Sequence, residues 1–246
     1  MKAVILAAGR GTRLAPLTDD RPKPLVEVGG RPLLLRTLER VQQAGIPHRD
    51  VVIVTGYREN MVAELMKREG LACKLVTNPR WYDWNSFYSL AVAKDALAGA
   101  PWLQFEGDVL FDDKILPRLL AAPFPGALAV EVKPMPDAEA MKARVTGPDH
   151  KIVALSKEED PAASIGEYVG IARVTAEVAK LVFDDLDKFV DEGITHQYYD
   201  HSYHRLAERG AAAFHAVDVA DCQAIEIDDP KDLANAEKIL RAQGAL

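Results

Sequence analysis

The chain has 246 residues, of which 48% are hydrophobic, and it carries a formal net charge of −7. This length and apolar content suit one α/β domain with a sizeable core, and the acidic balance argues against a nucleic-acid partner. No apolar run approaches the length of a membrane span, so we expect a cytoplasmic protein without membrane insertion. Cys73 and Cys222 have neither metal nor redox spacing, and we expect both thiols to be buried.

Short apolar runs alternate with amphipathic segments in the first half of the chain. The apolar runs predict strands at residues 3–8, 51–55, 74–76 and 102–105. Helical spacing predicts helices at residues 32–44, 59–68 and 86–98. This alternation predicts an α/β fold with a doubly wound, mostly parallel, Rossmann-like sheet.

The pattern changes after Pro123, where strands follow one another with few helices between them. The predicted strands cover residues 127–132, 143–145, 152–155, 168–174, 214–217 and 224–227. The predicted helices cover residues 176–192, 198–208 and 230–242. We therefore expect a mixed extension of the sheet with a small lobe.

The loop between the first strand and the first helix contains the most informative residues. The first apolar run stops at Gly9, and Gly11, Thr12, Arg13 and Lys23 follow in a stretch rich in glycine, proline and charge. Ligands of α/β sheets bind just beyond the carboxyl ends of the strands. Glycine lets backbone N–H groups approach oxygen atoms closely, and the two cations add charge, so the loop suits a polyphosphate. The spacing matches neither the dinucleotide fingerprint nor a P-loop, and the glycines alone would fit an ordinary loop.

The longer string is more specific. AAGRGTRLAPLT followed by RPKPLVEVGGRPLL closely resembles the signature of the nucleoside triphosphate-dependent nucleotidyltransferases that make NDP-sugars and CDP-alcohols, and the match runs from Val4 to Leu34. The resemblance implies a GT-A-type sheet whose loop wraps the triphosphate. It also implies that Arg13 steadies the leaving pyrophosphate and that Lys23 neutralises the reacting phosphates.

The same resemblance divides a single domain, residues 1–246, into two parts. Residues 1–122 would form the nucleotide-binding half, and residues 123–246 the acceptor-binding lobe and the closing elements. The strand end and loop would contribute nucleotide contacts from Leu6, Ala8, Gly9, Gly11, Thr12, Arg13 and Lys23.

An acidic turn, Glu106-Gly107-Asp108, follows the strand at 102–105. Nucleotidyl transfer needs a Mg²⁺ that bridges phosphate oxygens, and Asp108 is placed to hold it. An Asx turn is the alternative for Asp108. The resemblance favours the metal ligand and a catalytic role, while Glu106 and Gly107 would shape the turn or contact the nucleotide.

A second acidic pair lies near the C-terminus. Strand alternation puts Glu226 and Asp228 on one face, where they can converge on one cation. Asp228-Asp229-Pro230 also has the pattern of a helix N-cap followed by proline. The string AIEIDDPKDLANAE resembles the closing motif of the family, which implies that Glu226 and Asp228 complete the Mg²⁺ site with Asp108.

The stretch from Asn78 to Leu90 carries amides suited to reading a base. Asn85 or Ser86 is a candidate N-cap, and Asn78 and Asn85 could contact a base edge. The pattern N-x6-N-S-F-Y-S-L resembles the bacterial phosphocholine cytidylyltransferases, a branch of the same family. This favours CTP over UTP or dTTP and adds Asn78, Asn85 and Ser86 to the predicted nucleotide site.

An acceptor site needs a cationic side chain that binds the phosphate of the acceptor and further side chains that bind its head group. Lys157 resembles a family lysine near the reacting phosphates, whereas Lys133 is more simply a solvated side chain. Aromatic faces and carboxylates can hold an amine or trimethylammonium group. The candidates are Glu167, Tyr198, Tyr199, Asp200 and the Trp81/Tyr82/Trp84 cluster, although aromatic residues are more often core and Asp200 could simply cap its helix.

These observations predict an enzyme that joins CTP to a phosphorylated amino-alcohol with Mg²⁺, releasing pyrophosphate. Phosphocholine is the first acceptor, followed by phosphoethanolamine and 2-aminoethylphosphonate. The alternatives are sugar-1-phosphate nucleotidyltransfer and a non-catalytic nucleotide sensor of the same fold. A homodimer is compatible with the sequence.

Overall fold

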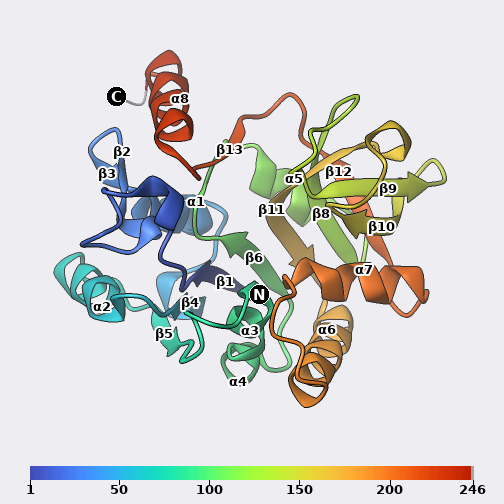
Figure 1. Cartoon of the computed structure of the whole chain (residues 1–246), viewed down its shortest axis with the longest axis horizontal. Coiled ribbons are helices and arrows are strands. Elements are labelled where there is room, and N and C mark those ends of the chain that lie inside the picture. The colour runs from blue at the N-terminus through green and yellow to red at the C-terminus, as the bar shows by residue number, and fades with distance from the viewer. Residues whose placement is uncertain (245–246) are drawn as a thin grey trace.

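The computed structural model describes residues 1–244, which form one continuous mixed sheet covered by helices on both faces (Figure 1). In the described residues the strands of the main sheet are, in spatial order, β5 (Lys74–Thr77), β4 (Val51–Thr55), β1 (Lys2–Ala7), β6 (Trp102–Glu106), β11 (Gly166–Val174), β8 (Gly126–Val132), β12 (Phe214–Asp218), β10 (Lys151–Ser156) and β9 (Lys142–Thr146). The α-helices are α1 (Leu33–Gln43), α2 (Glu59–Arg68), α3 (Ser86–Ala91), α4 (Lys94–Leu97), α5 (Ile115–Ala121), α6 (Ala176–Asp191), α7 (Asp200–Glu208) and α8 (Pro230–Ala242).

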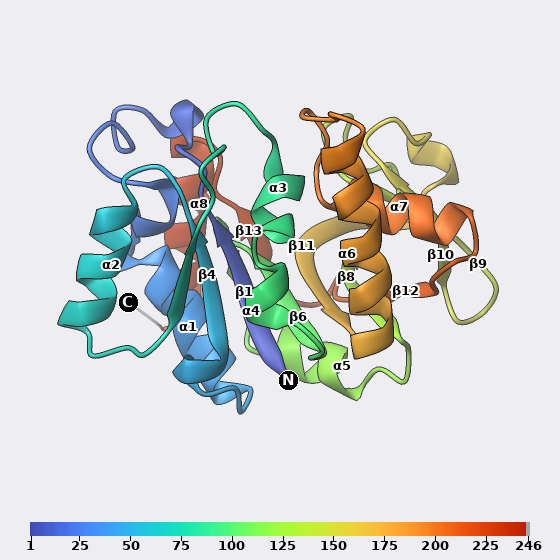
Figure 2. The same ribbon diagram turned by 90° about the horizontal axis from the view of Figure 1, so that it is seen from below.

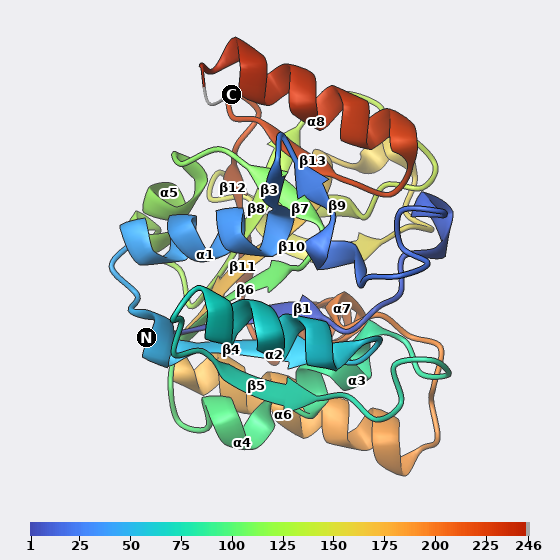
Figure 3. The same cartoon turned by 90° about the vertical axis from the view of Figure 1, so that its left-hand side faces the viewer.

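The first half of the chain builds the parallel part of the sheet. β5, β4, β1 and β6 all run parallel to their neighbours. Alternate residues of β1 enter two different cores: Ala3 and Ile5 pack with α1, α2 and α5, whereas Val4 packs with α3, α4, α6 and α7. Because both faces are covered, β1 is an almost continuous apolar run. Figure 2 looks onto the face that carries α3, α4 and α6, and Figure 3 shows α1 and α2 on the other side.

The second half adds the mixed lobe. β11 is antiparallel to both β6 and β8, β12 is parallel to β8, and β10 and β9 follow in antiparallel pairs. β9 also pairs with β11, so the far edge of the sheet folds back on its middle. The register of β11 shifts between Tyr168 and Ala172, and Gly170 there has a φ of 76°. A Cβ on Gly170 would lie 3.1 Å from Cδ of Glu106, so the glycine leaves room for that carboxylate.

The end of the chain returns to the first half. β13 (Ala224–Glu226) pairs with β7 (Val109–Phe111), and α8 packs near β2 (Glu27–Val28), which pairs with β3 (Arg31–Pro32). Leu14 of the first loop lies in one buried cluster with Ile227 and Leu240. This packing brings the two predicted acidic segments to the same end of the sheet as the first loop.

The predicted α/β class, with its parallel half and mixed lobe, is confirmed, and several element bounds agree closely. The predicted strand at 51–55 and the helices at 59–68 and 230–242 coincide with β4, α2 and α8. The helix predicted at 86–98 is instead two short helices, α3 and α4. Cys222 is buried as expected, but Cys73 is only half-buried, so that expectation was wrong.

Among residues 1–244, none of the helices combines the length and the apolar character needed to cross a bilayer.

Candidate active site

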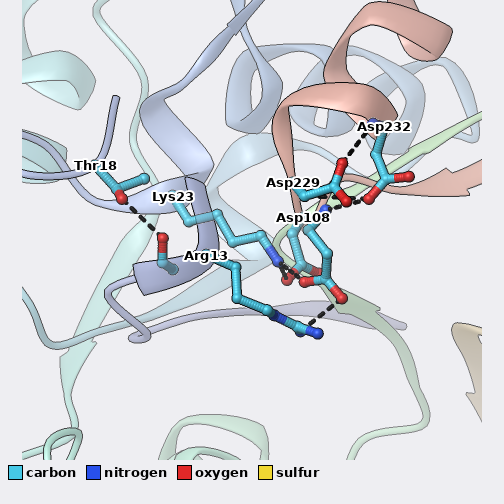
Figure 4. A network of polar contacts seen from close by, with 8 residues as sticks. Arg13, Thr18, Lys23, Asp108, Asp229 and Asp232 are labelled. Atoms are coloured by element: carbon cyan, nitrogen blue, oxygen red, sulfur yellow. Dashed lines mark hydrogen bonds and ion pairs between the residues drawn. The ribbon is translucent and has the colours of Figure 1, made fainter. Parts of the chain in front are cut away.

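The first loop doubles back so that Gly11 lies against Lys23. Gly11 has a φ of 74°, and a Cβ at this position would lie 2.8 Å from the Cβ of Lys23. The buried Thr18 hydroxyl donates a hydrogen bond to the Gly11 carbonyl at 2.7 Å (Figure 4). Glycine is therefore required here both for the backbone conformation and for the close approach of the lysine.

Lys23 connects the first loop to both acidic segments. Its Nζ donates to Oδ2 of Asp108 at 2.5 Å and to Oδ1 of Asp228 at 2.6 Å (Figure 4). Nη2 of Arg13 donates to the other Asp228 oxygen at 2.6 Å. Burial alone would lower the pKa of Lys23, but the two carboxylates outweigh burial and raise this pKa well above its ordinary value. The ammonium group is thus held charged at the end of β1 and β6.

Three carboxylates gather beside this ammonium. Glu106, Asp108 and Glu226 each offer one oxygen, and these oxygens all lie within 4.8 Å of one another. Oδ1 of Asp108 is buried and has no hydrogen-bond partner in the described part of the chain. Burial, and then the charge of Asp108, raise the pKa of Glu106 to about 8, against a hydrogen bond from Tyr199 that lowers it. A cluster of hard oxygen donors with an unpartnered buried oxygen fits a Mg²⁺ ion.

The predicted metal set differs from this cluster in one member. Glu106, which we expected to shape the turn, belongs to the tight cluster with Asp108 and Glu226. Asp228 instead receives the ion pairs from Arg13 and Lys23. Strand alternation predicted that Glu226 and Asp228 lie in one region, as they do. It could not predict which of the two lies closer to Asp108. The helix N-cap that we considered at this segment is Asp229, which forms a capping box with Asp232 at the start of α8 (Figure 4).

Two pockets meet at Glu106. The first, here called the first-loop pocket, has a volume of about 250 Å³. Its lining is Leu6, Ala8, Gly9, Asn78, Trp81, Trp84, Asn85, Ser86, Ser89, Glu106, Asp108, Tyr198, Tyr199 and Glu226. Most of the residues predicted to contact the nucleotide therefore share one hollow at the carboxyl end of β1.

The side-chain amides of Asn78 and Asn85, which we predicted to contact the base, already form hydrogen bonds within the protein. Asn78 is buried, donates from Nδ2 to Ser89 at 2.9 Å and accepts from the Arg80 backbone at 2.8 Å. Asn85 is the N-cap of α3, accepting from the Ser86 backbone at 2.7 Å, and its Nδ2 donates to the His196 carbonyl at 3.0 Å. Each amide keeps one N–H and one lone pair for a ligand.

The aromatic cluster lies in a different place from the one we expected. Trp81 and Trp84 line the first-loop pocket, and the side chain of Tyr82 is largely exposed. None of the three lines the second pocket, so the structure separates them from most of the other residues predicted for the head group. A tryptophan pair beside amides suits the flat face of a base. The aromatic run in the sequence signalled a binding surface but could not tell which pocket it serves.

The second pocket, here called the lobe pocket, has a volume of about 430 Å³ and opens between β11, β13 and the mixed lobe. Residues predicted for the acceptor line it, namely Lys157, Glu167, Tyr198 and Asp200. Lys133 also lines it and pairs with Glu131 at 2.7 Å and with Glu167 at 2.6 Å, so it is not a solvated side chain. Arg13, whose side chain is 70% exposed, reaches the same pocket.

Tyr199 departs from its predicted role. Its side chain is fully buried and lines the first-loop pocket instead of the lobe pocket. The hydroxyl donates to Oε1 of Glu106 at 2.7 Å and lies 3.2 Å from the Tyr168 hydroxyl. Tyr199 therefore orients a carboxylate of the cluster rather than an acceptor.

Thr12 and Gly107, which we also predicted to contact the nucleotide, lie in tight turns of the backbone. Thr12 begins a short 3₁₀ turn at the exposed tip of the loop. Gly107 is buried, and a Cβ there would lie 2.6 Å from the Leu6 carbonyl oxygen. The turn that carries Asp108 can therefore pass β1 only with glycine at 107.

The comparisons with known proteins agree with this arrangement. The family model described as "Nucleotidyl transferase" matches residues 2–141, more than half of the chain. Over 247 aligned residues the chain is 31% identical to the CMP-5'-(3-aminopropyl)phosphonate synthase of Streptomyces rubellomurinus, covering 96% of this chain and 38% of that protein. Over 100 residues it is 42% identical to the choline-phosphate cytidylyltransferase of Streptococcus pneumoniae, covering 41% of this chain and 42% of that protein. The matched stretch thus spans less than half the length of either relative.

A solved structure extends the comparison to the whole fold. The CTP:phosphocholine cytidylyltransferase from Streptococcus pneumoniae superposes with a TM-score of 0.78 at 26% identity, covering 97% of this chain and 98% of that chain. The parallel half, the mixed lobe and the returning C-terminal elements are therefore shared. On the family model, the alignments and the fold together, the chain belongs to the nucleotidyl transferase family.

Proposed function

We propose that the protein is a Mg²⁺-dependent cytidylyltransferase that joins CTP to a small phosphorylated or phosphonylated amine, releasing pyrophosphate. The observation that carries the proposal is the shared ammonium of Lys23. One cation bonded to Asp108 and Asp228, beside the cluster of Glu106, Asp108 and Glu226, combines a fixed positive charge with a set of metal ligands. Phosphocholine and the aminoalkyl phosphonates both belong to the proposed acceptor class, and the names of the relatives include both kinds.

The reaction needs no covalent enzyme intermediate, because the acceptor oxygen is already an anion at neutral pH. That oxygen attacks the α-phosphorus of CTP in line, forming a new P–O bond as the bond from the α-phosphorus to the bridging oxygen of pyrophosphate breaks. Lys23 offsets charge on the α-phosphate, and Arg13 with the first-loop amides stabilises the leaving pyrophosphate. Mg²⁺, held by Glu106, Asp108 and Glu226, would supply further positive charge at the phosphate oxygens.

The first-loop pocket supports a nucleotide by its composition. Leu6, Ala8 and Gly9 provide the strand end, and Trp81 and Trp84 provide flat apolar faces. The remaining hydrogen-bonding capacity of Asn78 and Asn85 offers donors and acceptors in the same hollow. Every nucleobase presents donors and acceptors on its Watson–Crick edge, so CTP is our first nucleotide because the similar proteins include cytidylyltransferases.

A panel of substrates tests the proposal. Pyrophosphate release would be measured with CTP, UTP, dTTP and GTP, each with aminated acceptors and with glucose 1-phosphate and mannose 1-phosphate. We expect turnover with CTP and aminated acceptors, dependent on Mg²⁺. Faster turnover with a hexose 1-phosphate would overturn the acceptor class, and tight CTP binding without pyrophosphate release from any pair would exclude an enzyme.

A further inference from the structure

We infer that the acceptor's amine is a primary ammonium received by Asp200, and that the lobe pocket disfavours a quaternary trimethylammonium group. The inference rests on the proposed function and narrows its acceptor class. It depends on which charged and aromatic groups of the lobe pocket already form ion pairs, hydrogen bonds or cation–π contacts within the protein.

Asp200 is a buried acid of this pocket whose carboxylate has no side-chain partner in the described chain. It is the first residue of α7, it lines the lobe pocket and it is only 4% exposed. Among residues 1–244, no side chain donates a hydrogen bond to its carboxylate or lies within ion-pair distance of it. Burial raises the pKa of Asp200 to about 7, although the charge of Lys157 acts in the opposite direction. Hydrogen bonds from the backbone N–H groups of Asp200 and His201 offset the burial only in part, so a ligand cation at this point would stabilise the charged carboxylate.

Other carboxylates of the pocket are already engaged. Glu131 and Glu167 share the ammonium of Lys133. Asp228 is paired with Arg13 and Lys23. These acids have little left to offer an incoming amine, and this distinguishes Asp200 from them.

The aromatic faces that a quaternary ammonium needs are not available. Tyr168 and Tyr198 are the aromatic residues that line the lobe pocket in the described chain. Tyr168 is 4% exposed, with its hydroxyl 3.2 Å from that of Tyr199. The ring of Tyr198 already has Nζ of Lys157 at 5.4 Å from its centroid. A trimethylammonium group has no N–H donor and is held mainly by cation–π contacts with several rings, which this pocket does not present.

A primary ammonium fits the same surroundings. Its three N–H donors can reach the free Asp200 oxygens directly, giving a charge-assisted hydrogen bond in a site shielded from water. Three methyl groups in place of these hydrogens would hold the charge farther from the carboxylate and give its oxygens no N–H donor from the ligand. The phosphate or phosphonate end of the acceptor would then lie toward Lys157, Arg13 and the carboxylate cluster.

Two matched substrate pairs test the inference. Phosphoethanolamine is compared with phosphocholine, and 2-aminoethylphosphonate with its N,N,N-trimethyl analogue, by kcat/KM for pyrophosphate release at saturating CTP and Mg²⁺. The members of each pair differ only by three methyl groups. We expect the primary amine to be favoured in both pairs by about 10–100-fold, as the loss of a charged hydrogen bond predicts.

Asp200→Asn provides the second measurement. It keeps the shape of the side chain and removes its charge, so kcat/KM for phosphoethanolamine should fall by about 10–100-fold while that for phosphocholine changes little. Glu139→Gln is the matched control, because Glu139 lines the same pocket and its side chain is 90% exposed, with only a long contact of 3.8 Å to Nζ of Lys157. That variant should keep the preference for the primary amine, and CTP binding measured by calorimetry should be the same in both variants.

The outcomes separate this inference from the proposed function. Turnover of phosphocholine equal to or better than that of phosphoethanolamine would overturn the inference and leave the cytidylyltransferase proposal intact. An unchanged preference in Asp200→Asn would also overturn it. Absence of pyrophosphate release with every aminated acceptor would overturn the proposed function and the inference together.

Discussion

The first-loop pocket and the lobe pocket share Glu106, but they differ in how their polar groups are satisfied. Around the first loop, Arg13 and Lys23 both pair with Asp228, which lies 215 and 205 residues away from them in the sequence. Asn78 and Asn85 each have an internal partner at both ends of the amide. In the lobe pocket, no side chain of the described chain bonds to the buried Asp200, which receives only backbone hydrogen bonds. The comparison indicates that, apart from one oxygen of Asp108, the proposed nucleotide side is fixed by contacts within the protein, whereas the proposed acceptor side keeps a carboxylate for its ligand.

The largest expected effect comes from breaking the shared ammonium. Lys23→Ala or Asp108→Asn should lower kcat by about 10²–10³-fold, because each removes a charge that acts on the reacting phosphates. Pyrophosphate release gives the rate, and thermal unfolding monitors the fold. Lys23 is buried and shared by two carboxylates, so Lys23→Ala should also lower the stability, and the rates are compared at a temperature where the variant is folded.

Arg21→Ala is the control for that pair of variants. Arg21 lies two residues before Lys23 in the same loop, and its guanidinium bonds only to the neighbouring Asp20 among the described side chains. It also removes a positive charge from the first loop, but we expect near-normal turnover. Near-normal turnover of Lys23→Ala instead would refute the catalytic role of the lysine.

The second effect tests the backbone of the first loop. Gly11→Ala introduces a side chain at a φ of 74° and within 2.8 Å of Lys23, so it should displace the ammonium. We expect kcat to fall by about 10–100-fold and stability by about 1–3 kcal/mol, as strain of this kind predicts. Urea unfolding measures the stability.

Gly9→Ala separates strain from the mere addition of a methyl group. A Cβ on Gly9 would meet nothing within 4 Å in the described chain, and its φ is not in the left-handed region. Its free energy of unfolding should therefore stay close to that of the parent protein. Equal destabilisation by both variants would contradict the argument for Gly11.

The third effect concerns the link between the two pockets. Tyr199→Phe removes the hydroxyl that donates to Glu106 and should loosen the carboxylate cluster. Mutation of a group that orients a metal ligand typically lowers the affinity for the metal by about 10–100-fold. We expect a rise of about tenfold in the Mg²⁺ concentration needed for half-maximal rate, with a smaller change in the KM for CTP. An unchanged Mg²⁺ requirement would assign Tyr199 a packing role only.

Much of the fold was predictable because its signals are local. β4, α2 and α8 follow from apolar periodicity and from caps within a few residues. The β7–β13 ribbon was not predictable as a pair, since Phe111 meets Ala224 from the far end of the chain. Pairing at such separation depends on the packing of α8 over the first half, which no short window reveals.

The sequence was sufficient to predict which segments form the site. It was not sufficient to predict which side chains in those segments contact one another. The sequence pointed to the first loop and to both acidic segments, and these do converge. It could not show that Glu106 joins the cluster in place of Asp228, because that depends on the space left beside Gly170 of β11. Likewise, the buried position of Tyr199 depends on how α7 packs on the sheet.

The smallest expected effect tests the burial of Asp200 through the pH dependence of stability. The pKa of this carboxyl is about 7 in the folded protein and near 3.8 as a free side chain, so the folded state holds its proton over a range where the unfolded state has lost it. The contribution of Asp200 to the stability should therefore fall as the pH rises from 4 to 7 and then level off. Asp200→Asn abolishes this contribution, so the variant should match the stability of the wild type near pH 4 and exceed it at pH 8 by about 4 kcal/mol.

Other titratable groups near Asp200 also affect the pH dependence of stability. Lys157 opposes the rise in its pKa, and Glu106, Tyr168 and Tyr203 also feel its charge. These groups are present in both proteins, so the difference between the two urea-unfolding curves isolates position 200 to a first approximation. Glu139→Gln should show little pH-dependent difference, because solvent screens an exposed charge. If Asp200→Asn were less stable than the wild type at pH 8, the buried carboxylate would have a partner within the protein, and the contrast between the two pockets would be wrong.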